Sequence, residues 1–143
     1  MHGVAQALCT ALNLDRHVSF HGFQPTDRLP ALYQRAHLLV LPSRHEAAGI
    51  VVLEAGASGL PSIGTESGYI ADWSPRAAFG VPAGDEEALA DGIVALLNDP
   101  ARRESIGHEA ERRARLRDAD WSAHAMERLF LATIDRQPFD DTA

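Results

Sequence analysis

The stretch that decides the fold of this chain is SRHEAAGIVVLEAGASGLPSIGT, residues Ser43–Thr65. It carries two acids, Glu46 and Glu54, which stand eight positions apart. Between them lie a glycine, Gly49, and an unbroken apolar run, Ile50–Leu53. A buried helix does not need the first acid, and a surface helix would not carry the apolar run. The two carboxylates therefore need an explanation of their own.

The flanks of this stretch indicate its secondary structure. Leu38–Leu41 is apolar at every position, which predicts a strand buried on both faces, as in a parallel sheet. Gly59 followed by Pro61 is a helix stop signal, so we expect a helix from about Gly49 to Ser58. The next strand is expected over 61–64, which makes the stretch one strand–loop–helix–strand unit. Such units bind ligands at the carboxyl ends of their strands.

The rest of the chain is expected to alternate between strands and helices. Asp85 and Asp99 are typical capping residues, and Pro100 supports a helix start directly after Asp99. A loop with one helical turn is expected over 65–73. The pattern predicts an α/β doubly wound layer in one domain, residues 1–136, followed by a polar tail, 137–143. The further expected elements are strands over 18–21 and 78–81 and helices over 4–14, 26–36, 85–98, 99–117 and 121–136.

The composition narrows the function classes. The formal net charge is −7, which argues against a protein that tracks nucleic-acid phosphates or binds an anionic membrane. All 13 basic residues are arginine, and the chain has no lysine. A single cysteine makes no intrachain disulfide, which fits a reducing cytoplasm. No run approaches the length of a membrane span, and the histidines show no short metal-ligand spacing.

The two acids fit a site for a nucleoside diphosphate. A helix that begins at Gly49 offers free backbone N–H groups and the positive end of its dipole to an anion. Glu54 lies five residues further on, about 7.5 Å along the axis, which matches the reach from phosphate to ribose. Glu54 is then placed to bind ribose hydroxyls, and Glu46 to meet a hydroxyl-rich group on the other side. The alternative is a helix-surface acid at Glu54 and a dipole complement at Glu46.

Six short motifs, read in order, resemble the carboxy-terminal domain of retaining glycosyltransferases of the large family 4 group. They cover nearly the whole chain, and the Glu-x7-Glu element between Pro-Ser and Gly-x-Pro is the most specific of them. The resemblance implies a Rossmann-like, three-layer domain of the GT-B fold, with about four strands and helices on both faces, incomplete at its amino terminus. The motifs are residues 18–22, 29–33, 41–44, 46–55, 59–61 and 84–85.

The resemblance also implies an activity. The family transfers a sugar, here a hexosyl group, from a nucleotide-sugar donor with retention at the anomeric carbon, without a metal ion or other cofactor. Electrostatic stabilisation of the leaving diphosphate is the main catalytic contribution expected. The acceptor is a sugar or a lipid-linked molecule. The implied catalytic residue is Glu46, and the implied donor-binding residues are Glu54, Gly49, Ile50, Arg44, Thr65, Ser67, Gly68 and Phe23.

This sequence departs from the family pattern at several points. Ala48 stands where an aromatic residue is usual, and Ser67-Gly68 stands where Gly-Gly is usual. The family domain normally begins with two further strands, which carry an arginine and a lysine that clamp the diphosphate, and an acceptor domain precedes it. Three interpretations follow: a partial glycosyltransferase, one subunit of a split enzyme whose partner chain supplies the missing part, or a non-catalytic binding remnant.

The arginine-rich segment Arg112–Arg117 leaves another choice open. It could contact a membrane surface, where related enzymes find lipid acceptors. Interspersed acids favour a solvated helix face instead.

Overall fold

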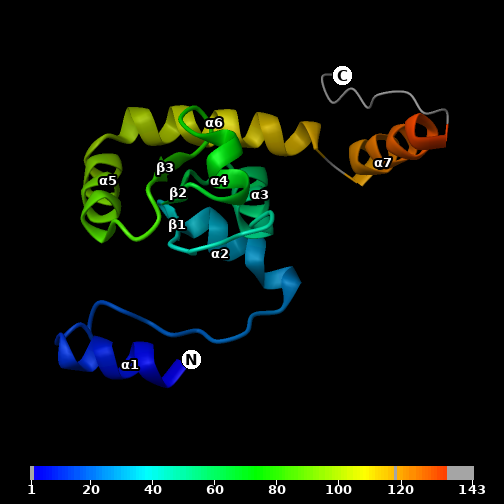
Figure 1. Cartoon of the computed structure of the whole chain (residues 1–143). Helices are drawn as coiled ribbons and strands as arrows, with labels where there is room; N and C mark the ends of the chain where they lie inside the picture. Colours follow the sequence, from blue (N-terminus) through cyan, green and yellow to red (C-terminus); the bar gives the residue numbers. More distant parts are fainter. Residues whose placement is uncertain (1, 118, 135–143) are drawn as a thin grey trace.

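A computed structural model describes residues 2–117 and 119–134 of the chain (Figure 1). Its centre is a sheet of three parallel strands in the order β1-β2-β3. The strands are β1 (Leu39–Leu41), β2 (Ser62–Thr65) and β3 (Phe79–Val81). Each lies within one residue of a strand expected from the sequence. The expected mixed α/β layer is confirmed, with three strands in place of about four.

The fourth expected strand, over 18–21, is wrong. These residues form no strand, and they are not part of the three-stranded sheet. Val18 and Phe20 are exposed, so the segment also lacks a core to pack on. A strand is defined by its partner, because extended backbone without one leaves its N–H and C=O groups to water. The alternating pattern at 18–21 is therefore not sufficient to form a strand here.

The helices alternate with the strands as expected, and their bounds differ from the expected ones at several points. The helix expected over 4–14 ends at Ala11, the helix expected over 26–36 opens as a 3₁₀ turn, and the single turn expected after β2 is a six-residue helix. The expected helix end at Arg136 and the tail 137–143 lie outside the described residues. The helices are α1 (His2–Ala11), η1 (Thr26–Arg28), α2 (Leu29–Arg35), α3 (Ile50–Ala57), α4 (Gly68–Trp73), α5 (Glu86–Asn98), α6 (Pro100–Leu116) and α7 (Ala119–Ile134).

Two of the helix starts form as the local sequence dictates. The Asp85 carboxylate accepts a hydrogen bond from the Ala88 backbone N–H at 2.8 Å. The Asp99 carboxylate accepts one from the Arg102 N–H at 2.9 Å, directly ahead of Pro100. These side chains satisfy backbone donors that have no partner inside the helix.

The core has two parts because β2 alternates its side chains between the two faces of the sheet. Ile63 is fully buried on one face, where it packs with Leu96 of α5 and Ile106 of α6. On the other face, α3 and α4 supply Val52, Ile70 and Trp73. Figure 1 shows α5 on one side of the strands, α3 and α4 on the other, and α6 running past both. Helices thus cover both faces, and α6 joins the two clusters.

The chain also exposes apolar groups at the margins of this layer. β1 is an edge strand, and Val40, which shares a face with Ile63, is 38% exposed. The expectation that this strand is buried on both faces is therefore wrong, because no strand covers its outer edge in the described sheet. Figure 1 shows α1 and α7 away from the sheet. Leu8 of α1 and Phe130 of α7 are correspondingly exposed. None of the helices in the described ranges has the length and apolarity needed to cross a membrane.

Gly107 provides a test of how closely α6 packs on the sheet. A Cβ atom at Gly107 would overlap the Gly59 carbonyl oxygen, a backbone atom at the entry to β2. We expect Gly107→Ala to lower the free energy of unfolding by about 1–3 kcal/mol, because α6 must shift to accept the methyl group. Chemical denaturation measures this value.

Gly3→Ala is the matched control, because nothing lies within 4 Å of a Cβ built there. It is also a helical glycine, so the substitution should be neutral or slightly stabilising. Equal stability of the two variants would contradict the packing described for α6.

Candidate functional site

The loop between β1 and α3 is fastened to the carboxyl end of β2. The Thr65 hydroxyl, at the last residue of β2, donates a hydrogen bond to the Ser43 carbonyl oxygen. The Ser43 hydroxyl in turn donates to Glu46 Oε1 at 2.7 Å. The sequence-predicted residues Glu46 and Thr65 are therefore linked through Ser43, which sequence reasoning had not assigned a role. A serine that orients an acid three positions later gives no periodic signal.

The start of α4 closes on the same loop from another direction. The Tyr69 backbone N–H donates to the Ala48 carbonyl oxygen at 2.7 Å. Gly68 has φ +51°, and a Cβ atom there would overlap that same oxygen. A residue with a side chain would be strained twice at this position, by its φ angle and by the overlap. The side-chain oxygen of Ser67 is buried and has no partner among the described residues.

Gly49 sets the entry into α3. It caps the helix in the left-handed conformation, with φ 72° and ψ 58°. A Cβ atom built on Gly49 would lie 3.7 Å from Glu46 Cγ, so the acid and the start of the helix are neighbours. The N–H groups of Gly49, Ile50 and Val51 donate to no acceptor in the described ranges. Free N–H groups and the positive end of the helix dipole make this position suitable for an anion.

Glu54 points from α3 toward α2, where it meets a side chain that the sequence analysis had given no function. The Tyr33 hydroxyl donates to Glu54 Oε2 at 2.7 Å. Beside this pair is a cleft of about 390 Å³ between α2 and α3. Thr26, Leu29, Pro30, Tyr33, Gln34, Glu54, Ala57 and Ser58 line it. Glu54 is thus a half-buried acid at a cleft, with one oxygen held by the protein.

The environment of Tyr33 raises the pKa of its hydroxyl to about 12. Burial is the largest cause, and the hydrogen bond and charge of Glu54 add to it. All three causes disfavour the phenolate. Tyr33 therefore stays a hydrogen-bond donor across the ordinary pH range.

Two of the predicted donor-binding residues lie outside the network of contacts that joins the loop, α3 and the cleft. The Phe23 ring is 93% exposed, and the Arg44 side chain is exposed. Within the described residues, neither makes a hydrogen bond, ion pair or ring contact. The other predicted residues form two neighbouring groups. One comprises Glu46, Gly49, Ile50, Thr65, Ser67 and Gly68 around the loop, and the other is Glu54 at the cleft.

The other charged groups in the described part of the chain form no second site of this kind. Arg112 and Arg113 pair with Glu109, and Arg115 pairs with Glu111, which favours the solvated helix face for this arginine-rich segment. In residues 2–117 and 119–134, no three His, Cys, Asp or Glu side chains gather in a way that would suit a metal ion.

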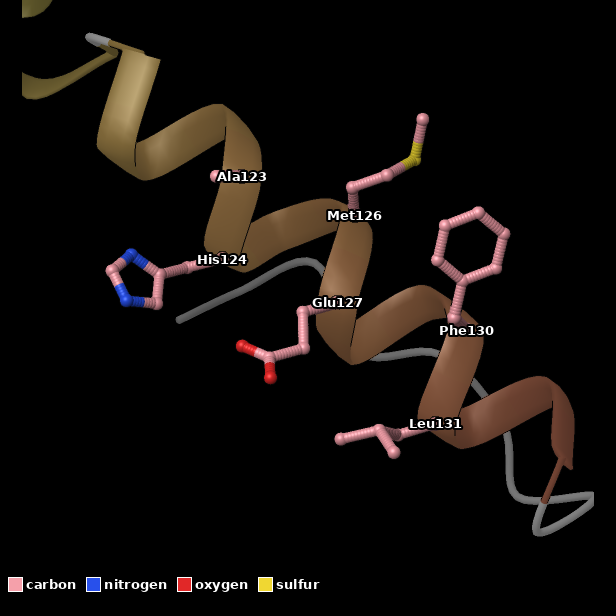
Figure 2. Close-up of a pocket in the computed structure, with 6 residues that line it drawn as sticks. All are labelled: Ala123, His124, Met126, Glu127, Phe130 and Leu131. Atoms are coloured by element: carbon pink, nitrogen blue, oxygen red, sulfur yellow. The ribbon is translucent and has the colours of Figure 1, made fainter.

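A larger hollow of about 550 Å³ lies along α7, away from the loop and the cleft. Figure 2 shows Met126 and Phe130 leaving the helix on one side and His124, Glu127 and Leu131 on the other. All the residues that line it come from this one helix, so its polar groups do not converge.

Comparison with known proteins gives a family for this chain. The model of the family described as glycosyl transferases group 1 matches residues 4–113. The match covers the sheet, the fastened loop, α3 and most of α6. The chain belongs to the glycosyl transferases group 1 family.

Individual relatives of the family agree with this assignment. D-inositol 3-phosphate glycosyltransferase of Corynebacterium efficiens is 30% identical over 84% of this chain and 28% of its own length. The enzyme of the same description from Salinispora tropica is 36% identical, over 76% of this chain and 23% of its own length. Sulfoquinovosyl transferase SQD2 of Arabidopsis thaliana is also 36% identical, over 73% of this chain and 21% of its own length. The chain spans about a quarter of the length of these curated relatives.

Solved structures share the fold of this chain. Sucrose-phosphate synthase from Thermosynechococcus elongatus superposes with a TM-score of 0.82 over 93% of this chain and 34% of its own, at 29% identity. HepE of Anabaena, solved in complex with UDP, superposes with a TM-score of 0.79 over 92% of this chain and 36% of its own, at 23% identity. The expected Rossmann-like GT-B carboxy-terminal fold is thereby confirmed.

The pairing of Tyr33 with Glu54 can be measured directly. In a Tyr69→Phe background only Tyr33 contributes tyrosinate absorbance, and we expect its titration midpoint near pH 12. Glu54→Gln removes the charge but not the burial, so the midpoint should fall while staying above the ordinary value of 10.0. Because the folded state holds this proton more tightly, stability should also decline as the pH rises from 10 to 12. An unchanged midpoint in Glu54→Gln would contradict the pairing.

Proposed function

We propose that this chain supplies the donor-binding half of a metal-independent transfer of a hexosyl group from a nucleotide sugar, with retention at the anomeric carbon. The observation that carries the proposal is the arrangement along α3. Free N–H groups lie at its start, Glu46 lies beside them, and Glu54 lies at the cleft with α2. The half-site therefore offers an anion position and, on either side of it, an acid suited to hydroxyl groups.

The diphosphate belongs at the start of α3 in this proposal. The N–H groups of Gly49 and Ile50 donate to its oxygens, and the helix dipole stabilises the charge that develops as the sugar bond breaks. Thr65, Ser67 and Gly68 border the phosphate and sugar side, where the Ser67 hydroxyl is buried and unpaired in the described residues. The contribution of Arg44 is a neutralising charge, reached by moving its exposed side chain toward the phosphates.

The nucleoside belongs on the α2 side. Glu54 accepts hydrogen bonds from the ribose hydroxyls, about 7.5 Å along the helix from the phosphate. The cleft beside it takes the base, and the exposed ring of Phe23 is available to stack on that base. Glu46 faces the donor sugar near the reacting carbon and is the proposed catalytic carboxylate.

The acceptor side of the reaction is a further proposal. The acceptor is a sugar or lipid-linked molecule bound by other parts of the enzyme, in the same polypeptide or in a partner chain. The exposed edge of β1 and the exposed apolar residues of α7 support the existence of such a part, because both would otherwise leave apolar groups in water. Purification of the chain as a rigid monomer with active sugar transfer would argue against it.

Calorimetric titration with UDP, GDP and ADP tests the nucleotide site. We expect saturable binding of one of the three by the chain. Glu54→Ala should weaken that binding about 10- to 100-fold, since a hydrogen bond to a charged group contributes about 1.5–3 kcal/mol.

Glu87→Ala is the matched control, because it removes the same charge from an exposed position on α5. Binding by Glu54→Ala that equals binding by the control would refute the ribose contact. Absence of saturable binding of all three nucleotides would contradict a self-sufficient half-site.

Glu46→Gln tests the sugar side separately. Because Glu46 is proposed to meet the sugar and not the nucleoside, the affinity for the free nucleoside diphosphate should change less than about twofold. The affinity for the matching nucleotide hexose should fall about tenfold or more. Equal losses for both ligands, measured by the same titration, would show that Glu46 does not distinguish the sugar.

A further inference from the structure

The hydrogen bond between Tyr33 and Glu54 links two helices at the edge of the cleft. Tyr33 stands on α2 and Glu54 on α3, 21 positions apart in the sequence. The bond is 2.7 Å long and reaches Oε2 of the carboxylate. Glu54 Oε1 accepts no hydrogen bond from the described residues. One oxygen is thus held by the protein, and the other is left for a ligand.

We propose that Tyr33 is a positioning residue for nucleotide recognition, which holds Glu54 so that its free oxygen accepts a hydrogen bond from a ribose hydroxyl. The proposal rests on the proposed function of Glu54. A carboxylate on a half-buried glutamate has several torsions to fix before it can make a directed hydrogen bond. A fixed partner on α2 sets those torsions before the ligand arrives.

The chemistry of Tyr33 suits this role. A phenol hydroxyl donates to a carboxylate and remains a donor as long as it keeps its proton. The pKa of Tyr33 is raised to about 12, so the donor persists at every pH at which the enzyme would work. The direction of the bond is therefore fixed, with Tyr33 donating and Glu54 accepting.

The position of Tyr33 adds a second reason. Its side chain lines the cleft together with Leu29 and Pro30, the first two residues of α2. The Tyr33→Phe substitution removes only the hydroxyl and keeps the aromatic ring that lines the cleft. The variant therefore separates orientation of the acid from the shape of the cleft.

A purely structural bridge between α2 and α3 predicts a different result from a positioning role. A bridge that only stabilises the fold would affect all nucleotides alike. A residue that orients Glu54 toward the ribose affects only nucleotides that carry ribose hydroxyls. The comparison therefore needs the ribonucleoside diphosphate that binds and its 2′,3′-dideoxy analogue.

The experiment is calorimetric titration of both nucleotides into the wild-type chain, Tyr33→Phe, Glu54→Ala and the double variant. We expect Tyr33→Phe to weaken binding of the ribonucleotide about five- to twentyfold and of the dideoxy analogue less than about twofold. The double variant should bind the ribonucleotide as Glu54→Ala does, because Tyr33 acts through Glu54. Thermal unfolding of each variant checks that it is folded.

Equal weakening of both nucleotides by Tyr33→Phe, or no weakening of either, would overturn the positioning role. If Glu54→Ala weakens ribonucleotide binding in that case, the proposed ribose contact stands and only the role of Tyr33 fails. Unchanged binding in Glu54→Ala would overturn the ribose contact and the positioning role together. If Tyr33→Phe does not fold, Tyr33→Met removes the same hydroxyl and fills the space with a flexible apolar chain.

Discussion

The hydrogen bond from the Thr65 hydroxyl to the Ser43 carbonyl ties the carboxyl ends of β1 and β2 together, and the rest of the site depends on it. The loop that leaves β1 would otherwise be free to move away from the sheet. The loop is held at two points, by Thr65 at the end of β2 and by the Tyr69 N–H of α4, which donates to the Ala48 carbonyl oxygen. A glycine at position 68 is required for the second contact, because a side chain would meet the Ala48 oxygen.

The fastened loop explains why two acids flank a helix of this kind. It carries Glu46 to the start of α3, while the length of the helix carries Glu54 to the cleft beside α2. Each acid also has a hydroxyl donor on one oxygen, Ser43 for Glu46 and Tyr33 for Glu54. Both carboxylates are therefore oriented before any ligand binds, which reduces the ordering cost of recognition.

The sequence predicts the central unit well because the signals there are local. Uniform apolarity at 38–41, the stop at Gly59 and Pro61, and the aspartate caps at 85 and 99 each act within a few residues. The prediction of a strand over 18–21 is wrong because the sequence pattern of a segment does not show whether a neighbouring strand is present to pair with it. A local sequence pattern can predict that a segment is extended, but a strand forms only where a neighbouring strand is available to pair with it.

The candidate site is predictable to a smaller extent. The motif spacing places Glu46, Gly49 and Glu54 on one loop and helix, as the structure has them. Tyr33 lies in a quoted motif, but its contact with Glu54 crosses two helices and leaves no periodic trace. Phe23 and Arg44 have suitable chemistry, but their side chains are exposed, and sequence alone does not give their orientation.

The most direct test of the account follows backbone amide resonances by NMR while UDP, GDP or ADP, whichever binds, is added to the chain. The proposed function puts the diphosphate at the free N–H groups of α3 and the nucleoside beside Glu54. We therefore expect the largest shifts at Gly49, Ile50 and Val51, with smaller shifts at Tyr33 and Glu54. Saturable binding that leaves these amides unchanged, with the shifts gathered on α7 or elsewhere, would contradict this placement.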